Sequence, residues 1–493
     1  MNTNTPNPDS IGHLARKGIQ WTLILIVARQ ALSLGSTFVI ARLLIPEDYG
    51  AVALVTTILG ILYLVANIGL PWTIVQSDNL NQPTLNTLFI FTGTIGFLAW
   101  ILCCISGYSL AFFYNSPKLT SIAMALGSCL VFRNLSIVPL ALIRRQVRQD
   151  LLTIIQTTGL VLSISIAIGI AWLGGHYWAL VAQQITNELI GFTLALHYST
   201  FRLAHPASIK SLFPFLHFGG HLGITNILNS IQRSTPQLVL GFFGSEYAGL
   251  FNRAAWLKDM PYTYTALSLN DVMIPSLLAF RNQPVRLENA YHKALRGVAS
   301  VGCLFAVWLG ATATQTIPIL LGPKWLPAAE ILTILTPAGV MLPIYGTLPW
   351  LYIATGRSKE MLIRSFIMMA TIITACLISI PMGAKAVVTV VSLTSAFPIS
   401  WAAIFLAHKT ANISFSKTSK ALLPILVSST FAFFAGGLVD YLNAKIDWSI
   451  AYFLIAKTAA VVLSYLMLLS LLDRNLMKIY FQEISKYLQR RTS

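Results

Sequence analysis

Apolar blocks of about 20 residues or more recur along almost the whole chain, and no other feature limits its fold as strongly. A helix needs about 20 apolar residues to cross the roughly 30 Å of hydrocarbon in a bilayer. Only 10% of the 493 residues are charged and 56% are hydrophobic, whereas soluble domains carry about 25% charged residues. A soluble surface cannot be covered with so few charges, so the sequence predicts an all-α integral membrane protein.

We expect about fourteen transmembrane helices. The predicted spans are residues 18–41, 50–76, 84–107, 119–143, 151–173, 177–199, 209–243, 247–280, 292–321, 327–354, 360–382, 385–407, 421–441 and 448–472. The first apolar stretch is longer than the core of a signal peptide, so we interpret it as a true span. No loop is long enough to hold a soluble domain, so binding or transport must take place within the helical bundle.

Lysine and arginine are distributed unevenly between the predicted loops. With the N-terminus inside, 22 of the 33 basic residues fall in cytoplasmic segments and 5 on the opposite side. Cytoplasmic loops collect basic residues, so this bias predicts that both termini are cytoplasmic and that the number of spans is even. It also explains most of the net charge of +17 without a nucleic-acid partner.

A short motif recurs at the same place in each half of the chain. Pro-Glu-Asp-Tyr-Gly at residues 46–50 follows the first span, and Ser-Glu-Tyr-Ala-Gly at residues 245–249 follows the seventh. Six predicted spans separate the two motifs, so the halves share one topology. This pattern predicts a parallel repeat, of the kind that rocks around a central site in transporters.

Nine charged residues remain well inside the predicted spans, away from the span ends. The basic ones are Arg29, Arg133, Arg233, Arg253, Lys258 and Lys457, and the acidic ones are Glu188, Asp259 and Asp271. Each costs roughly 2.5–3.5 kcal/mol at the centre of a helix, so such charges persist where they face a cavity or a partner. Arginine binds phosphate through paired hydrogen bonds. We therefore take Arg29, Arg233, Arg253 and Arg133 as candidates for a substrate cavity that holds a phosphate or pyrophosphate.

Other roles stay open for several of these residues. Arg133 could hold a helix carbonyl or pair with Glu188, Lys258 could pair with Asp259, and Lys457 could snorkel or mark a lipid groove. Glu188, Asp271 and Asp259 are candidates for coupling an ion. The five cysteines fit no zinc or redox spacing, and the sequence has no nucleotide-binding loop and no clustered metal ligands. We therefore expect no cofactor and no metal.

Several blocks, taken in order, resemble the Wzx/WzxC-type polysaccharide exporters of the multidrug/oligosaccharidyl-lipid/polysaccharide flippase superfamily. The opening signature is Ala-Arg-Leu-Leu at 41–44 followed by Pro-Glu-Asp-Tyr-Gly at 46–50. Supporting blocks lie at 69–76, 247–254, 321–325 and 356–357. The similarity covers residues 14–410 approximately.

The resemblance implies two six-helix lobes around a central cavity, at residues 18–208 and 209–410, with two additional helices in 411–472. The remaining segments would be cytoplasmic tails, at residues 1–17 and 473–493. It also implies export of undecaprenyl-pyrophosphate-linked oligosaccharide across the bacterial inner membrane by alternating access. The partners implied are a polysaccharide polymerase and export machinery. The family's cavity arginines carry over only to Arg253. Many members have an acidic residue where this chain has Thr235 and Pro236, which puts ion coupling at that position in doubt.

Two other functions compete with the exporter. A cation-coupled drug or small-solute antiporter would need an acidic cavity, whereas six basic residues face three acidic ones here. A membrane-bound glycan polymerase or ligase would need a long outer catalytic loop, and none is predicted. The sequence therefore favours a flippase for lipid-linked sugars and does not favour an enzyme.

Overall fold

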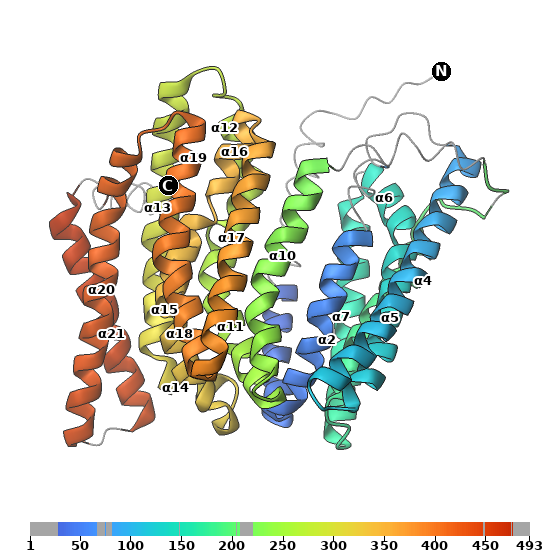
Figure 1. Ribbon diagram of the computed structural model, residues 1–493, viewed down its shortest axis with the longest axis horizontal. Helices are drawn as coiled ribbons and strands as arrows, with labels where there is room; N and C mark the ends of the chain where they lie inside the picture. Colours follow the sequence, from blue (N-terminus) through green and yellow to red (C-terminus); the bar gives the residue numbers. More distant parts are fainter. Residues whose placement is uncertain are drawn as a thin grey trace, which may run out of the picture. The chain divides into compact units, whose positions relative to one another are not determined.

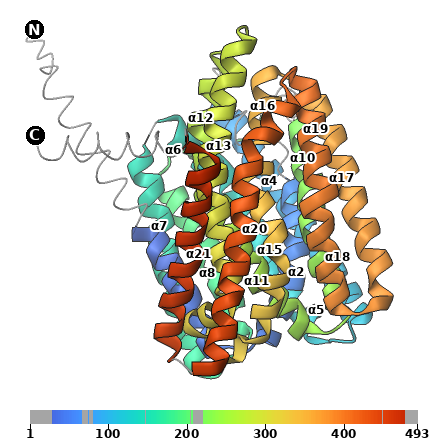
Figure 2. The same cartoon turned by 90° about the vertical axis from the view of Figure 1, so that its left-hand side faces the viewer.

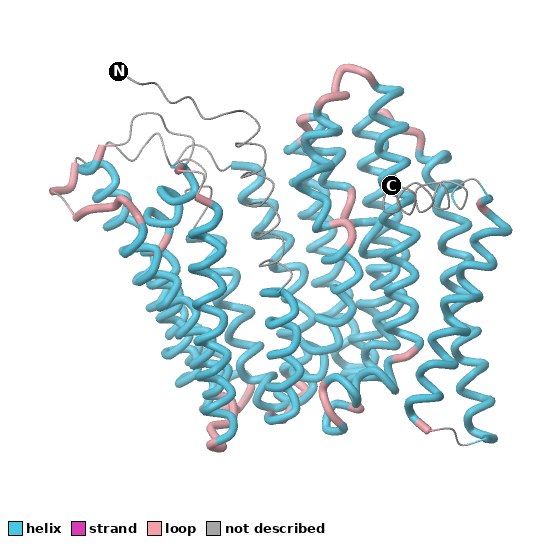
Figure 3. Tube along the Cα trace, turned by 180° about the vertical axis from the view of Figure 1, so that it is seen from behind, coloured by secondary structure: helices cyan, strands magenta, loops and turns pink. Residues whose placement is uncertain are grey.

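A computed structural model describes residues 28–66, 74, 81–146, 148–203, 205–207, 220–446, 449–474 and 476. Helices account for every regular element in these ranges, as Figure 3 shows, so the all-α prediction is confirmed. Backbone contacts divide the chain into two compact units, Met1–Gly223 and Ile224–Ser493. The predicted tail at residues 1–17 lies outside the described residues, as do the block at 69–76 apart from Ile74 and most of the tail at 473–493. The lobe boundaries expected from the sequence stay predictions.

The first unit is a bundle of long helices (Figure 1). Residues 28–43 are helical and are followed by α2 (Pro46–Ala66), α4 (Gln82–Phe113), α5 (Lys118–Leu135), α6 (Ile137–Arg145), α7 (Gln149–Trp172) and α8 (Trp178–Tyr198). Helix α5 packs against α2, α4 and α8, and α7 packs against α8. Helices α5 and α6 therefore form the core of this unit. A polar side chain buried between them and their neighbours needs a hydrogen-bonding or ionic partner.

Helices α4 and α5 approach each other closely at a small residue. A Cβ atom at Gly107 of α4 would lie 2.2 Å from the Cβ of Ala123 of α5, which is closer than two carbon atoms can approach. Small residues let membrane helices pack closely without a hydrophobic driving force. Gly107 therefore fixes the spacing of this pair.

The second unit contains more and shorter helices. They are α10 (Gly220–Gly241), α11 (Ser245–Tyr264), α12 (Asn270–Leu278), α13 (Pro284–Ala311), α14 (Ala313–Leu320), α15 (Pro327–Tyr345), α16 (Leu348–Thr355), α17 (Ser358–Ser379), α18 (Ala384–Thr394), α19 (Ser400–Ala411), α20 (Phe415–Ile446) and α21 (Ile450–Leu472). Helices α13 and α15 pack against each other, and both contact α11. The motif at 245–249 forms the first turn of α11, just as the motif at 46–50 forms the first turn of α2.

Prolines account for several interruptions of the predicted spans. Pro139 lies in the first turn of α6, directly after the break at Ser136 that separates α6 from α5. Pro398 lies in a π-helical turn, Ser395–Ile399, between α18 and α19. Proline removes a backbone donor and clashes with the preceding turn, so a helix bends or breaks there. The two prolines thus account for the interruptions at these positions.

Helices α20 and α21 form a hairpin beside α13, as Figures 1 and 2 show. Tyr465 Oη donates to the carbonyl of Ser300 at 2.8 Å, and Trp308 Nε1 donates to Thr458 Oγ1 at 3.0 Å. Each bond joins α21 to α13. The hairpin is thus tied to the rest of its unit by specific polar contacts as well as by apolar packing.

Ten helices of the described part of the chain are long and apolar enough to cross a membrane. Helices α8, α10 and α11 and the helix at residues 28–43 are not among them. Helices α8, α10 and α11 carry the polar candidates Glu188, Arg233, Arg253 and Asp259, which lower their hydropathy. A multi-pass membrane fold is confirmed, and the count of about fourteen spans stays a prediction.

Candidate functional site

The first unit contains a polar pocket with a volume of about 430 Å³. The helix at residues 28–43 and helices α2, α5, α6, α7 and α8 all contribute to its wall. The lining residues are Arg29, Gln30, Ser33, Tyr63, Arg133, Ser136, Ile137, Leu140, Arg144, Ile155, Gln156, Leu160, Asn187, Glu188 and Gly191. Three of the residues predicted from the sequence, Arg29, Arg133 and Glu188, therefore meet in one cavity.

Arg133 lies between an aromatic ring and a carboxylate. Its guanidinium carbon is 3.7 Å from the ring centroid of Tyr63, and its Nε is 4.0 Å from Glu188 Oε1. The ring face attracts the cation, and the carboxylate partly neutralises it. At 4.0 Å the contact with Glu188 is electrostatic, since hydrogen bonds of this kind are about 2.7–2.9 Å long. The pairing considered in the sequence analysis is thus present, but it is loose.

The other two arginines reach the pocket from different helices. Arg29 is half-buried and its NH1 donates a hydrogen bond to Gln156 Oε1 of α7. Arg144 is exposed and lies in the last turn of α6. Three guanidinium groups share the wall with one carboxylate, so the lining has a net formal charge of +2. Such a wall is suited to an anion with more than one negative oxygen.

Glu188 and Arg144 mark the two ends of the pocket. Glu188 is the eleventh of the 21 residues of α8, which places it midway along that helix. Arg144 lies eleven positions after Arg133, which corresponds to about 16 Å along a helix. The pocket therefore extends from the middle of the bundle towards the end where α6 stops and α7 begins.

The remaining candidates lie in the second unit and do not line this pocket. Arg233 is exposed, 5.7 Å from the ring of Tyr262. Arg253 donates to Oδ1 of its neighbour Asn252 at 2.8 and 3.2 Å. Asp259 pairs with the adjacent Lys258 at 2.7 Å, and Asp271 is exposed in the first turn of α12. Their roles in substrate binding or ion coupling stay predictions.

Lys457 has a partner that the sequence analysis missed. It is 2% exposed, and its Nζ is 2.5 Å from Asp440 Oδ1 on the neighbouring helix α20. Asp440 falls at the end of a predicted span and looks like a loop residue in the sequence. The pair gives this lysine a structural role in the hairpin.

The lining residues that the sequence analysis missed include Tyr63, Arg144, Gln156 and Asn187. Arg144 was assigned to a cytoplasmic loop. One signal was present, because Arg133, Ile137, Leu140 and Arg144 recur at spacings of four, three and four, which places them on one helix face. Among the described residues, no group of three or more His, Cys, Asp or Glu side chains could hold a metal ion.

The fold and the pocket together define the class: an all-helical, multi-pass membrane protein with a basic cavity inside one of its helical units. A family model described as polysaccharide biosynthesis protein matches residues 39–330. The chain belongs to this family.

Relatives agree with this assignment. The lipopolysaccharide biosynthesis protein WzxC of Escherichia coli K12 is 20% identical over 352 residues, 69% of this chain and 70% of WzxC. The succinoglycan biosynthesis transport protein ExoT of Rhizobium meliloti is 20% identical, over 68% of each chain. Both names place the relatives in polysaccharide biosynthesis, and ExoT is named as a transport protein.

Solved structures show the same fold. The lipid II flippase MurJ, in an inward closed conformation, matches with a TM-score of 0.71 and 15% identity, over 93% of this chain and 99% of MurJ. An inward-facing multidrug resistance transporter of the MATE family matches with a TM-score of 0.63 and 15% identity, over 79% of this chain and 96% of its own. The transporter fold predicted from the sequence is thus confirmed.

Proposed function

We propose that this protein flips undecaprenyl-pyrophosphate-linked oligosaccharide across the bacterial inner membrane, for the synthesis of a surface polysaccharide. The observation that carries the proposal is the basic pocket of the first unit, in which Arg29, Arg133 and Arg144 outnumber Glu188. The transport role named for ExoT and the flippase role named for MurJ support it. The protein acts as a transporter, and no chemical step on the substrate is required of it.

The pocket binds the phosphate end of the substrate. A pyrophosphate carries at least two negative charges, which match the net formal charge of the lining. Arg144, in the last turn of α6, contacts the phosphate first. Arg133 then binds the phosphate deeper in the bundle, opposite Tyr63. Glu188 competes with the phosphate for Arg133, so it limits how tightly the substrate is held. A transporter needs such a limit, because a substrate that binds too tightly is not released.

Arg144 extends the pocket lining to the end of the unit where α6 stops and α7 begins. The distribution of basic residues predicts that this end is cytoplasmic, together with both termini. Lipid-linked oligosaccharide is available to the pocket from that side. The polysaccharide polymerase and the export machinery are the proposed partners on the opposite side.

A cation-coupled multidrug antiporter is the alternative, and the similarity to the MATE transporter favours it. A drug cation would need a pocket with a net negative charge. The single carboxylate of this pocket faces three arginines, so cations are repelled from it. The charge of the pocket therefore supports the flippase.

The test is a translocation assay with fluorescent lipid-linked oligosaccharide in proteoliposomes. Wild-type protein is compared with Arg29→Ala and with Arg148→Ala, an exposed arginine paired with Asp150 at 3.7 Å outside the pocket. We expect wild type and Arg148→Ala to translocate at the same rate and Arg29→Ala to be at least ten-fold slower. If wild type moves no lipid-linked sugar but extrudes cationic drugs, the proposed function is wrong.

A further inference from the structure

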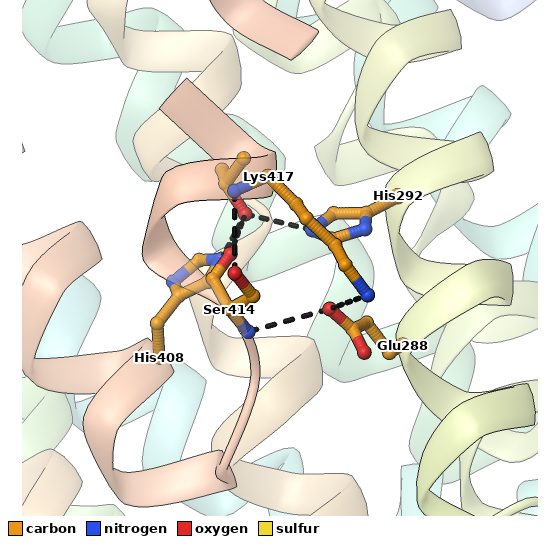
Figure 4. Close-up of polar contacts among 6 residues, drawn as sticks. Glu288, His292, His408, Ser414 and Lys417 are labelled. Atoms are coloured by element: carbon orange, nitrogen blue, oxygen red, sulfur yellow. Dashed lines mark hydrogen bonds and ion pairs between the residues drawn. The ribbon is translucent and has the colours of Figure 1, made fainter. Parts of the chain in front are cut away.

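Two histidines that lie 116 residues apart in the sequence meet at one threonine in the second unit. His292 of α13 and His408 of α19 each place Nε2 at 2.7 Å from Oγ1 of Thr418, at the start of α20. His408 and Thr418 are both 0% exposed. Figure 4 shows the two rings on either side of the first turn of α20. The three side chains therefore form one buried hydrogen-bonded chain across three helices.

The donor and acceptor roles in this hydrogen-bonded chain follow from the one contact in which they are fixed. His408 Nδ1 is 2.7 Å from the carbonyl oxygen of Ile404, which can only accept, so Nδ1 carries a proton. In a neutral ring Nε2 then accepts, and it takes the hydroxyl proton of Thr418. The threonine oxygen in turn accepts from Nε2–H of His292. In this arrangement Thr418 Oγ1, both ring nitrogens of His408 and Nε2 of His292 all have partners.

One more proton can enter without leaving a buried donor unmatched. If His408 Nε2 is protonated, it donates to Thr418 instead of accepting from it. The threonine proton then turns to the carbonyl of Ser414 at 3.3 Å, and Thr418 Oγ1 accepts from both rings. The same heavy atoms thus satisfy two proton counts. A buried histidine that lacked such an alternative would lose a hydrogen bond on protonation, at a cost of about 1–3 kcal/mol.

Charged side chains of both signs surround the cluster formed by His292, Thr418 and His408. Glu288 acts on both rings, and its Oε1 accepts from the backbone N–H of Ser414 and pairs with Lys417, each at 3.3 Å. Arg296 of α13 and Lys417 of α20 are the cations that act on His292, and Arg296 is paired with Asp473 beyond α21. The rings of Tyr291 and Phe415 flank His408 at 5.7 and 6.4 Å. Burial disfavours the charged form of both rings, and Glu288 is the anion that opposes this effect.

We propose that His292, Thr418 and His408 form a proton-binding site, and that its occupancy sets how α20 is held against α13 and α19. Glu288 couples proton binding to the position of α20, because it holds the turn before α20 through Ser414 and also acts on the two rings. When the cluster gains a proton, Glu288 is drawn towards it and its hold on Ser414 and Lys417 weakens. Substrate transport then depends on pH at this end of the bundle, a consequence that rests on the proposed function.

The direct test is a titration of the ¹⁵N-labelled histidine rings of the full chain by NMR, between about pH 3 and pH 8, because burial favours the neutral rings. The chain has eight histidines, and His292→Gln and His408→Gln assign the two signals. We expect both rings to respond to the same one-proton step. Thr418→Val should separate their responses, and Thr418→Ser, which keeps the hydroxyl, should preserve the step. The proposal is overturned if neither ring titrates in this range, or if Thr418→Val leaves the titration unchanged.

Transport supplies the second readout. We expect His408→Gln to flatten the pH dependence of translocation at least three-fold, whereas His176→Gln, at an exposed site in the first unit, should leave it as in wild type. If His408→Gln slows transport by the same factor at every pH, the cluster is only structural and the proposal fails. If wild type does not translocate at all but the coupled titration is present, the proposed function fails and the proton site stands.

Discussion

The pair of Arg133 and Glu188 tests the pocket most sharply, because its two members are expected to act in opposite directions. Their closest atoms are 4.0 Å apart. Two unit charges at this distance interact by about 4 kcal/mol at an effective dielectric constant of about 20. The side chains are 42% and 26% exposed, so solvent screening reduces the interaction to about 1 kcal/mol.

Glu188→Gln keeps the size of the side chain and removes its charge. Arg133 is then no longer partly neutralised when it binds the substrate phosphate. The gain of about 1 kcal/mol should lower the apparent KM about five-fold, since 1.4 kcal/mol is a factor of ten. Arg133→Gln removes the partner of the phosphate and leaves Glu188 facing it. Hydrogen bonds to charged groups contribute about 1.5–3 kcal/mol, so KM should rise about ten-fold or more.

The measurement is the initial rate of translocation in proteoliposomes over a range of lipid-linked oligosaccharide concentrations, at matched protein content. Arg148→Gln and Asp150→Asn are the matched controls, because they form an exposed ion pair in the same unit. The double variant of Arg133 and Glu188 should differ from the sum of the single variants, as expected for residues in contact. The reasoning is refuted if both single variants shift KM in the same direction, or if Glu188→Gln raises it.

Two further predictions concern stability, measured by thermal unfolding in detergent. Gly107→Ala should destabilise the protein by about 1–3 kcal/mol, because its Cβ would lie 2.2 Å from that of Ala123. The control Gly60→Ala, whose Cβ would have no neighbouring atom within 4 Å, should be neutral or stabilising. Equal effects of the two substitutions would contradict the packing argument. Asp440→Asn should cost about 3 kcal/mol, because it leaves the buried charge of Lys457 unpaired. Lys457→Met should cost about 1 kcal/mol or less, since Asp440 is 49% exposed and can be solvated. If Lys457→Met destabilises the protein more than Asp440→Asn does, the lysine is not the buried partner.

The sequence was sufficient for the fold class and for part of the pocket. Long apolar blocks can only be spans, and charges inside spans must face a cavity or a partner, which identified Arg29, Arg133 and Glu188. Arg144 was missed because the basic end of a span looks like a loop, and the helix continues to Arg145. Tyr63 was missed because an aromatic residue in an apolar helix carries no signal of its own.

The histidine cluster could not be predicted from the sequence. His292 and His408 lie on different helices, and the threonine that joins them belongs to a third. Periodicity relates residues within one helix, whereas the packing of α13, α19 and α20 decides which faces meet. Asp440 was missed for the same reason, since its partner Lys457 is on the neighbouring helix.

The intramembrane charges differ in how they are satisfied, and this difference points to function. Lys258 pairs with the adjacent Asp259, and Arg253 bonds to the adjacent Asn252, so their own helix provides the partner. In the pocket, by contrast, Arg29, Arg133, Arg144 and Glu188 come from four separate helices. Bringing three cations together from separate helices opposes folding, and one loosely paired carboxylate does not offset it. Under the proposed function an anion that binds at this wall offsets the repulsion, and the phosphate of a lipid-linked sugar is such an anion.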